Sequence, residues 1–121
     1  ERLELLLDYA GRLPDLPEDL KEARAQMEPV PECQAPVYLF SRFEDGKVYY
    51  NIDVPDEAPT VRGFAGILYE GLNGLPPHSV QTTPDDLYEQ MGLDKVLSPQ
   101  RLRGLTALLM RMKRRARDVA A

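Results

Sequence analysis

Apolar residues recur along the chain at two spacings, one typical of helices and the other of strands. Residues 2–13 carry leucines and alanines three or four positions apart, which predicts an amphipathic helix that ends before Pro14. Pro17 suits the first position of a second, shorter helix, and the carboxylates of Glu18 and Asp19 suit the positive end of its dipole. We therefore expect the chain to begin with two helices.

The middle of the chain changes to the alternation of half-buried strands. In residues 37–43, one side carries Val37, Leu39 and Phe43 and the other carries Tyr38, Phe40 and Arg42. Residues 48–54 place four apolar side chains on one face. Between them, Glu44, Asp45 and Gly46 match a tight hairpin turn. These patterns predict two antiparallel strands joined as a hairpin.

Helical spacing returns in the second half of the chain. Residues 61–72 carry an apolar stripe with two internal glycines, which lower helix propensity and indicate close packing against a neighbour. We expect a loop over residues 71–80 and a short helix over residues 83–92. A last helix should begin at Ser98 and reach the C-terminus. Two helices, a small sheet and three further helices predict the α+β class.

Composition and charge limit what such a chain can do. Its 121 residues, 43% of them hydrophobic, suit one domain over residues 1–121 with a single core. No apolar run reaches the length of a membrane span, so we expect a cytoplasmic protein, although a chain that begins with Glu1 rather than Met could lack a short leader. A net charge of −5 argues against nucleic acid as a partner. The basic residues near the C-terminus suit the negative end of the last helix.

Cys33 is the one cysteine of the chain, and it lies in a segment rich in proline. Prolines in residues 27–36 bias their neighbours toward extended backbone, which predicts an ordered, non-helical loop just before the hairpin. One cysteine can form neither an internal disulfide nor a structural zinc or cluster site. Since an accessible, electrostatically assisted thiol is a strong nucleophile, Cys33 is the candidate reactive residue.

Two other interpretations of Cys33 stay open. A lone cysteine is more often buried and inert, which would make the protein a non-catalytic adaptor. A cysteine hydrolase would need His78 within hydrogen-bond reach of the thiol, but nothing in the sequence pairs the two, and we expect His78 on the surface. Other polar residues suit turns, solvated surface or a helix start when they are taken alone, among them Asp53, Asp56, Glu57 and Arg101.

Four stretches in order along the chain resemble the SufE family and its close relative, the CsdE group. Residues 11–16 resemble the end of the family's first helix, and residues 58–63 resemble the start of its central helix. Residues 97–105 resemble the opening of its last helix. The stretch that resembles the family's cysteine loop is Val30-Pro31-Glu32-Cys33-Gln34-Ala35-Pro36-Val37-Tyr38. The four stretches span nearly the whole chain.

The resemblance implies a function for Cys33. The thiol would take a persulfide from a SufS-like cysteine desulfurase, stimulate that enzyme and pass the sulfur to a SufB-type scaffold complex for iron–sulfur cluster assembly. A CsdE-like carrier that feeds another sulfur pathway is the alternative. The protein would then be a sulfurtransferase-like carrier rather than a stand-alone enzyme. We expect it to be a monomer or a weak dimer, with neither nucleic acid nor a membrane as a partner. Pyridoxal phosphate belongs to the desulfurase, so no cofactor and no metal is expected here.

The resemblance also implies a fold and two supporting residues. The fold would be a three-stranded antiparallel sheet flanked by N-terminal and C-terminal helices, similar to the IscU-like scaffold proteins. Arg101 matches an arginine implicated in desulfurase engagement, and Glu57 falls at an acidic position that helps to hold the resting loop. The chain departs from the family at Glu32, where glycine is frequent, and at Tyr38, where tryptophan is usual. It also departs at Ala35 and Pro36, where small polar residues are frequent. A carboxylate beside the thiol should disfavour the thiolate, and proline should stiffen the loop.

Overall fold

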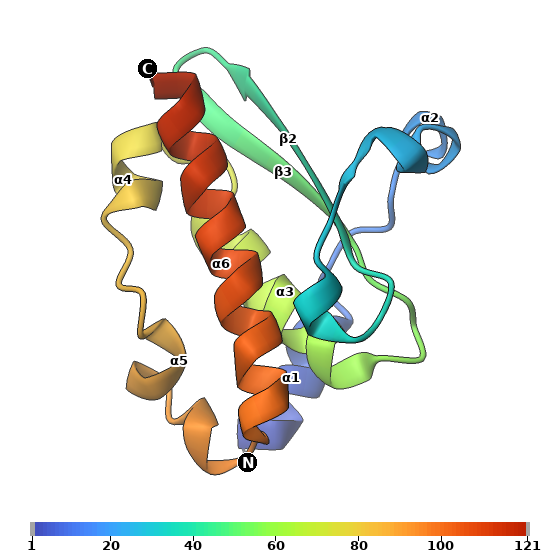
Figure 1. The fold of residues 1–121 in the computed structure, drawn as a ribbon, viewed down its shortest axis with the longest axis vertical. Helices are drawn as coiled ribbons and strands as arrows, with labels where there is room; N and C mark the ends of the chain where they lie inside the picture. The colour runs from blue at the N-terminus through green and yellow to red at the C-terminus, as the bar shows by residue number, and fades with distance from the viewer. Residues whose placement is uncertain (1, 121) are drawn as a thin grey trace.

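A computed structural model describes residues 2–120 as an α+β fold, which confirms the predicted class. Figure 1 shows the long helix α6 beside a small sheet, with α3 behind it and α1 near its N-terminal end. The helices are α1 (Arg2–Ala10), α2 (Glu18–Glu22), α3 (Pro59–Leu72), α4 (Pro77–Gln81), α5 (Leu87–Gln90) and α6 (Pro99–Ala120). The strands are β1 (Glu28–Pro29), β2 (Tyr38–Glu44) and β3 (Lys47–Asp53), and 3-10 turns cover Arg24–Gln26 (η1), Pro31–Cys33 (η2) and Leu93–Lys95 (η3).

The sheet is antiparallel with the order β1-β2-β3, as the resemblance implied. The predicted hairpin is confirmed, with Glu44 opposite Lys47 at its tip. Asp45 and Gly46 both have positive φ, at 52° and 76°, the backbone of a turn whose twist matches that of the two strands. Strand β1 pairs with β2 through only two residues, too few for any alternation to be visible in the sequence.

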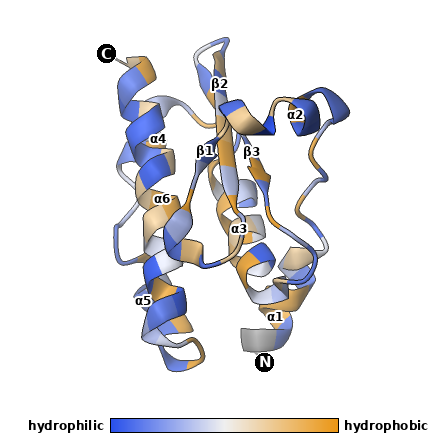
Figure 2. Ribbon diagram, turned by 45° about the vertical axis from the view of Figure 1, so that its right-hand side comes forward, coloured by the Kyte–Doolittle hydropathy of each residue, from blue (hydrophilic) through white to orange (hydrophobic). Residues whose placement is uncertain are grey.

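The core lies between the sheet, α3 and α6. The alternating face of β3 is buried as predicted, and each of its apolar side chains exposes 3% or less of its surface. The buried hydroxyl of Tyr50 donates a hydrogen bond of 2.7 Å to the carbonyl of Met112, which ties β3 to α6. Figure 2 shows hydrophobic residues over much of α3, β2 and β3, whereas α2 is largely hydrophilic. This packing fixes α6 against the sheet.

Two glycines bring α3 unusually close to α1. A Cβ atom at Gly63 would lie 2.1 Å from the carbonyl oxygen of Leu6, and one at Gly66 would lie 2.3 Å from that of Tyr9. The close packing predicted from these glycines is thus confirmed, and the partner is the first helix. The guanidinium of Arg62, the residue before Gly63, donates to the carbonyls of Val54 and Leu13 at 2.8 and 3.0 Å. The start of α3 is therefore held firmly.

Three predicted boundaries are wrong. Helix α1 ends at Ala10 rather than near residue 13, and the carbonyl of Ala10 accepts a bond from Arg62 instead of continuing the helix. Helix α4 occupies part of the predicted loop over residues 71–80, where a single buried side chain gives no apolar period. Helix α5 begins later than expected, at Leu87, and Thr83 does not cap it; the Thr83 hydroxyl instead donates to the carbonyl of Ser79 within α4.

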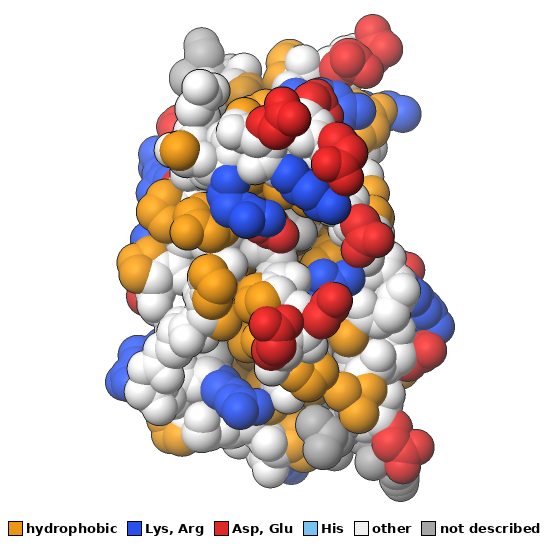
Figure 3. Space-filling model, turned by 90° about the vertical axis from the view of Figure 1, so that its right-hand side faces the viewer, with side chains coloured by type: hydrophobic (Ala, Val, Ile, Leu, Met, Phe, Trp, Pro, Cys, Tyr) orange, Lys and Arg blue, Asp and Glu red, His pale blue; other side chains and the backbone are white. Residues whose placement is uncertain are grey.

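The start of the last helix is confirmed. Helix α6 begins at Pro99, and the hydroxyl of Ser98 accepts a hydrogen bond from the backbone N–H of Arg101 at 3.3 Å. Within residues 2–120, no helix is both long enough and apolar enough to cross a membrane. On the face shown in Figure 3, acidic and basic side chains are interspersed rather than gathered by sign.

Candidate functional site

Cys33 lies in a closed loop between β1 and β2, which we call the cysteine loop (residues 31–36). Its base is closed by a hydrogen bond of 2.9 Å from the N–H of Val30 to the carbonyl of Val37. The 3-10 turn η2 forms its first half, and Gln34 follows with a left-handed φ of 58° that reverses the chain toward β2. The loop is ordered, as predicted, but the expectation of a wholly non-helical segment is wrong over residues 31–33.

The thiol of Cys33 faces helix α6. It is half-buried, and its Sγ donates a hydrogen bond of 3.4 Å to the carbonyl of Gly104. A Cβ atom at position 104 would lie only 2.8 Å from the Cα of Cys33, so the loop can pack this closely only against glycine. Gly104 is thus part of the site, although the sequence analysis gave it no function. Its signal was a glycine in the interior of a long helix, where it costs about 1 kcal/mol.

The environment of Cys33 keeps its thiol protonated. Burial, and to a smaller extent the neighbouring carboxylate of Glu32, raise the pKa of Cys33 to about 11, and the cation of Arg111 offsets only part of this rise. At pH 7 the thiol is therefore almost entirely protonated, more so than that of a free cysteine. The closed loop therefore holds the nucleophile in an unreactive form. The expected unfavourable effect of Glu32 on the thiolate agrees with this direction.

An ionic network joins the cysteine loop and β1 to α6. Arg111 binds Glu32 at 3.0 Å and Glu28 at 3.0 Å, and the carboxylate of Glu28 also pairs with Arg114 and Arg115. Burial opposes ionisation of Glu28, but the hydrogen bonds from Arg114 and Arg115 outweigh it and hold the pKa of Glu28 below its usual value. These arginines are thus bound by specific carboxylates and do not act only through the helix dipole.

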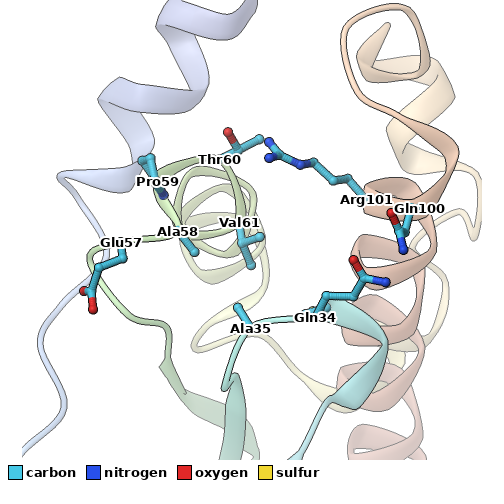
Figure 4. A pocket seen from close by; sticks show the side chains of 10 residues that line it. Gln34, Ala35, Glu57, Ala58, Pro59, Thr60, Val61, Gln100 and Arg101 are labelled. Atoms are coloured by element: carbon cyan, nitrogen blue, oxygen red, sulfur yellow. The ribbon is translucent and has the colours of Figure 1, made fainter.

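The three residues singled out by the resemblance surround one pocket. Cys33, Glu57 and Arg101 all line a pocket of about 270 Å³ between the cysteine loop and the starts of α3 and α6. Figure 4 shows the exposed side chain of Arg101 reaching across the pocket toward Thr60, while the exposed side chain of Glu57 points away from it. Arg101 thus gives the pocket that Cys33 lines a cation, and the polar side chain of Gln34 lines it as well.

A comparison with protein-family models shows to which family the chain belongs. The model of the SufE family, described as an Fe-S metabolism associated domain, matches residues 1–116. The chain belongs to the SufE family. This SufE-family chain is 46% identical over 119 residues to an uncharacterized SufE-like protein of Mycobacterium tuberculosis, which covers 98% of this chain and 82% of the relative. It is 32% identical over 105 residues to the sulfur acceptor protein CsdE of Escherichia coli, which covers 85% of this chain and 68% of the relative.

A solved structure agrees with the family assignment. The solution structure of a hypothetical protein from Thermus thermophilus matches with a TM-score of 0.83 and 42% sequence identity. The match covers 97% of this SufE-family chain and 82% of the other. The three-stranded α+β architecture is therefore shared beyond this chain.

His78 lies outside the site. Its side chain is exposed, as predicted, on α4, which packs beside the C-terminal half of α6 (Figure 1), whereas Cys33 packs at Gly104 in the N-terminal half. Among the described side chains no hydrogen bond joins His78 to Cys33. The same residues contain no cluster of three His, Cys, Asp or Glu side chains that could hold a metal ion. The structure thus gives the hydrolase interpretation no base for the thiol.

Proposed function

We propose that this protein is a sulfur acceptor that carries sulfur as a persulfide on Cys33. The observation that carries the proposal is the SufE-family match over residues 1–116, in a chain whose one thiol lines a pocket with Arg101. A relative with 32% identity, CsdE of Escherichia coli, is a sulfur acceptor protein, which supports the same activity here.

The transfer is an exchange between a thiol and a persulfide. The Cys33 thiolate attacks the terminal sulfur of a persulfide on the donor enzyme, and a new S–S bond forms at Cys33 Sγ. The donor's S–S bond breaks at the same time, and the donor cysteine leaves as a thiolate that takes up the proton lost by Cys33. The step is redox-neutral, because the transferred sulfur keeps its oxidation state. It needs no further oxidant or reductant.

The pocket beside Cys33 suits the product. Its volume of about 270 Å³ leaves room for one added sulfur atom on Cys33, which lines it. Arg101 lines the same pocket, and its cation would favour an anionic persulfide held there, because an opposite charge nearby stabilises the ionised form. We propose that Arg101 supports the transfer in this way and that Glu57, which points outward, acts on loop position or on the donor.

The donor we propose is a SufS-like cysteine desulfurase that carries the pyridoxal phosphate and is stimulated when its persulfide is removed. The acceptor of the sulfur would be a SufB-type scaffold complex for iron–sulfur clusters, and a CsdE-like delivery to another sulfur pathway is the second candidate. A binding experiment with each purified scaffold distinguishes these two destinations, since a carrier must engage its own acceptor.

Intact-mass spectrometry tests the proposal. The protein is incubated with a desulfurase, L-cysteine and pyridoxal phosphate, and we expect a gain of one sulfur atom that a reductant removes. Cys33→Ser should gain none. Equal stimulation of the desulfurase by the wild type and by Cys33→Ser, with no sulfur on either, would show that the protein is an adaptor with an inert thiol.

Substitutions at the pocket test the supporting residues. Arg101→Ala should slow the sulfur transfer, because the pocket that Cys33 lines loses its cation. Arg103→Ala is the matched control, since Arg103 is an exposed arginine of the same helix that does not line the pocket. Glu57→Gln should change the transfer less than Arg101→Ala. Equal rates for the two arginine variants would remove Arg101 from the mechanism.

A further inference from the structure

The ion pair between Glu32 and Arg111 lies one residue from Cys33. Its two charged groups are 3.0 Å apart, and the guanidinium of Arg111 exposes only 19% of its side-chain surface. Arg111 stands seven positions after Gly104 on α6, which is about two helical turns along the same side. The cysteine loop is therefore held to α6 at two points, the thiol at Gly104 and the carboxylate at Arg111.

We propose that the Glu32–Arg111 ion pair is a latch that holds the cysteine loop closed, and that Arg111 is a positioning residue for Cys33. Its consequence for sulfur transfer rests on the proposed function. Opening the latch exposes the thiol, and closing it returns the thiol to the carbonyl of Gly104. The prolines at the two ends of the loop, Pro31 and Pro36, make the segment between them move as a stiff unit.

The two carboxylates bound by Arg111 differ in a way that suits a latch. Glu28 in β1 pairs with Arg111, Arg114 and Arg115, so it stays anchored when one bond is lost. Glu32 in the loop pairs with Arg111 alone among the described residues, and its side chain is 44% exposed. The loop can thus detach from α6 while β1 stays in place. Arg111 remains on Glu28 as the loop opens, ready to bind Glu32 again.

Substitution of Arg111 separates the latch from a simple charge effect. Arg111 favours the thiolate of Cys33, so its removal would slow reaction of the thiol if electrostatics alone mattered. Loss of a latch has the opposite effect, because it exposes the thiol more often. Removal of Glu32 speeds the reaction under both explanations, so only the Arg111 variants decide between them.

Hydrogen–deuterium exchange of residues 31–37 is the deciding measurement, because amide exchange does not depend on thiol ionisation. We expect exchange of these amides in Glu32→Gln and Arg111→Gln to be roughly threefold faster than in the wild type, the effect of losing one partly exposed ion pair. Arg111→Lys, which keeps the charge, should exchange more slowly than Arg111→Gln. Arg114→Gln is the matched control: it removes one cation from Glu28, leaves Glu32 bound, and should exchange like the wild type.

Alkylation by iodoacetamide adds a second measurement on the same variants. Faster alkylation of Arg111→Gln than of the wild type supports the latch. High salt provides a further check: amide exchange of the wild type should become faster, whereas that of Glu32→Gln should not, because the ion pair is already lost. Unchanged exchange in both Arg111→Gln and Glu32→Gln overturns the proposal. Neither measurement uses a desulfurase, so a failure of sulfur transfer would contradict the proposed function and leave the latch standing.

Discussion

Gly104 offers a direct test of how the cysteine loop closes, through the substitution Gly104→Ala. The added Cβ would lie 2.8 Å from the Cα of Cys33, 3.0 Å from the carbonyl oxygen of Glu32 and 3.2 Å from the thiol. Two of these atoms belong to the backbone, so a side-chain rotation cannot relieve the contact. The closed loop should be destabilised by about 1–3 kcal/mol, the usual cost of overpacking. The open loop avoids the contact altogether.

The magnitude follows from this difference between the two loop states. Alanine favours helix α6 by about 1 kcal/mol over glycine, but this gain is the same whether the loop is open or closed. The open fraction should therefore rise by about fivefold to a hundredfold. The thermal midpoint should fall by no more than about 10 °C, because the helix gain leaves a net cost of at most about 2 kcal/mol.

Native alkylation by iodoacetamide, followed by intact mass, measures the effect. We expect Cys33 of Gly104→Ala to react at least about fivefold faster than Cys33 of the wild type, in proportion to the open fraction. Gly71→Ala is the matched control, since position 71 is helical and an added Cβ would meet nothing within 4 Å. An unchanged alkylation rate in Gly104→Ala, with normal folding, would refute the view that close contact with α6 shields the thiol.

Three further predictions concern stability and pH. Gly63→Ala should lower the free energy of unfolding by several kcal/mol, roughly as severe core overpacking does, because the added Cβ meets the backbone of α1 at 2.1 Å; chemical denaturation beside Gly71→Ala measures it. Tyr50→Phe should cost about 1–3 kcal/mol by the same measurement, since the buried carbonyl of Met112 loses its 2.7 Å donor, and an unchanged midpoint would contradict this. Alkylation of Cys33 should keep rising between pH 8 and 10, where an ordinary cysteine with a pKa near 8.5 levels off, because burial raises the pKa of Cys33 to about 11. A plateau near pH 9 would show that the thiol is not shielded. The raised pKa also means that the contribution of Cys33 to stability is present below about pH 8.5 and is lost as the pH rises toward about 11.

The elements that the sequence predicted well are those with a local period. The alternation of β3, the positive-φ turn at Gly46 and the proline start of α6 each depend on neighbours in the sequence, and each is confirmed. In β2 the alternation does not hold to the end, since Phe43 near the hairpin tip is exposed. Strand β1 and helix α4 were missed because two residues or one buried side chain carry no period. Their positions are set by the elements that they pack against.

The same difference between local and long-range signals separates the site residues that the sequence predicted from those that it missed. Cys33 was singled out from its proline-rich surroundings, which are local, and the family resemblance added Arg101 and Glu57, whose functions stay predictions. Gly104 and Arg111 were missed because their contacts with the loop join positions 71 and more residues apart. A glycine in a helix and a basic run at a C-terminus each have simpler local explanations, so only the folded chain reveals that both face the cysteine loop.

The side chain of Glu32 acts both on the ionisation of the Cys33 thiol and on the position of the cysteine loop. In the closed loop its carboxylate disfavours ionisation of Cys33, and its bond to Arg111 keeps the loop on α6. Both effects act against reaction, so an inert resting thiol needs no complete burial. When the loop moves off α6, the bond between Glu32 and Arg111 is lost. The thiol also leaves the carbonyl of Gly104 and becomes hydrated, which weakens the effect of the carboxylate on its ionisation. Exposure and activation of the nucleophile are therefore one conformational step. The glycine that is frequent at this position in the family has no charge and could not link the two.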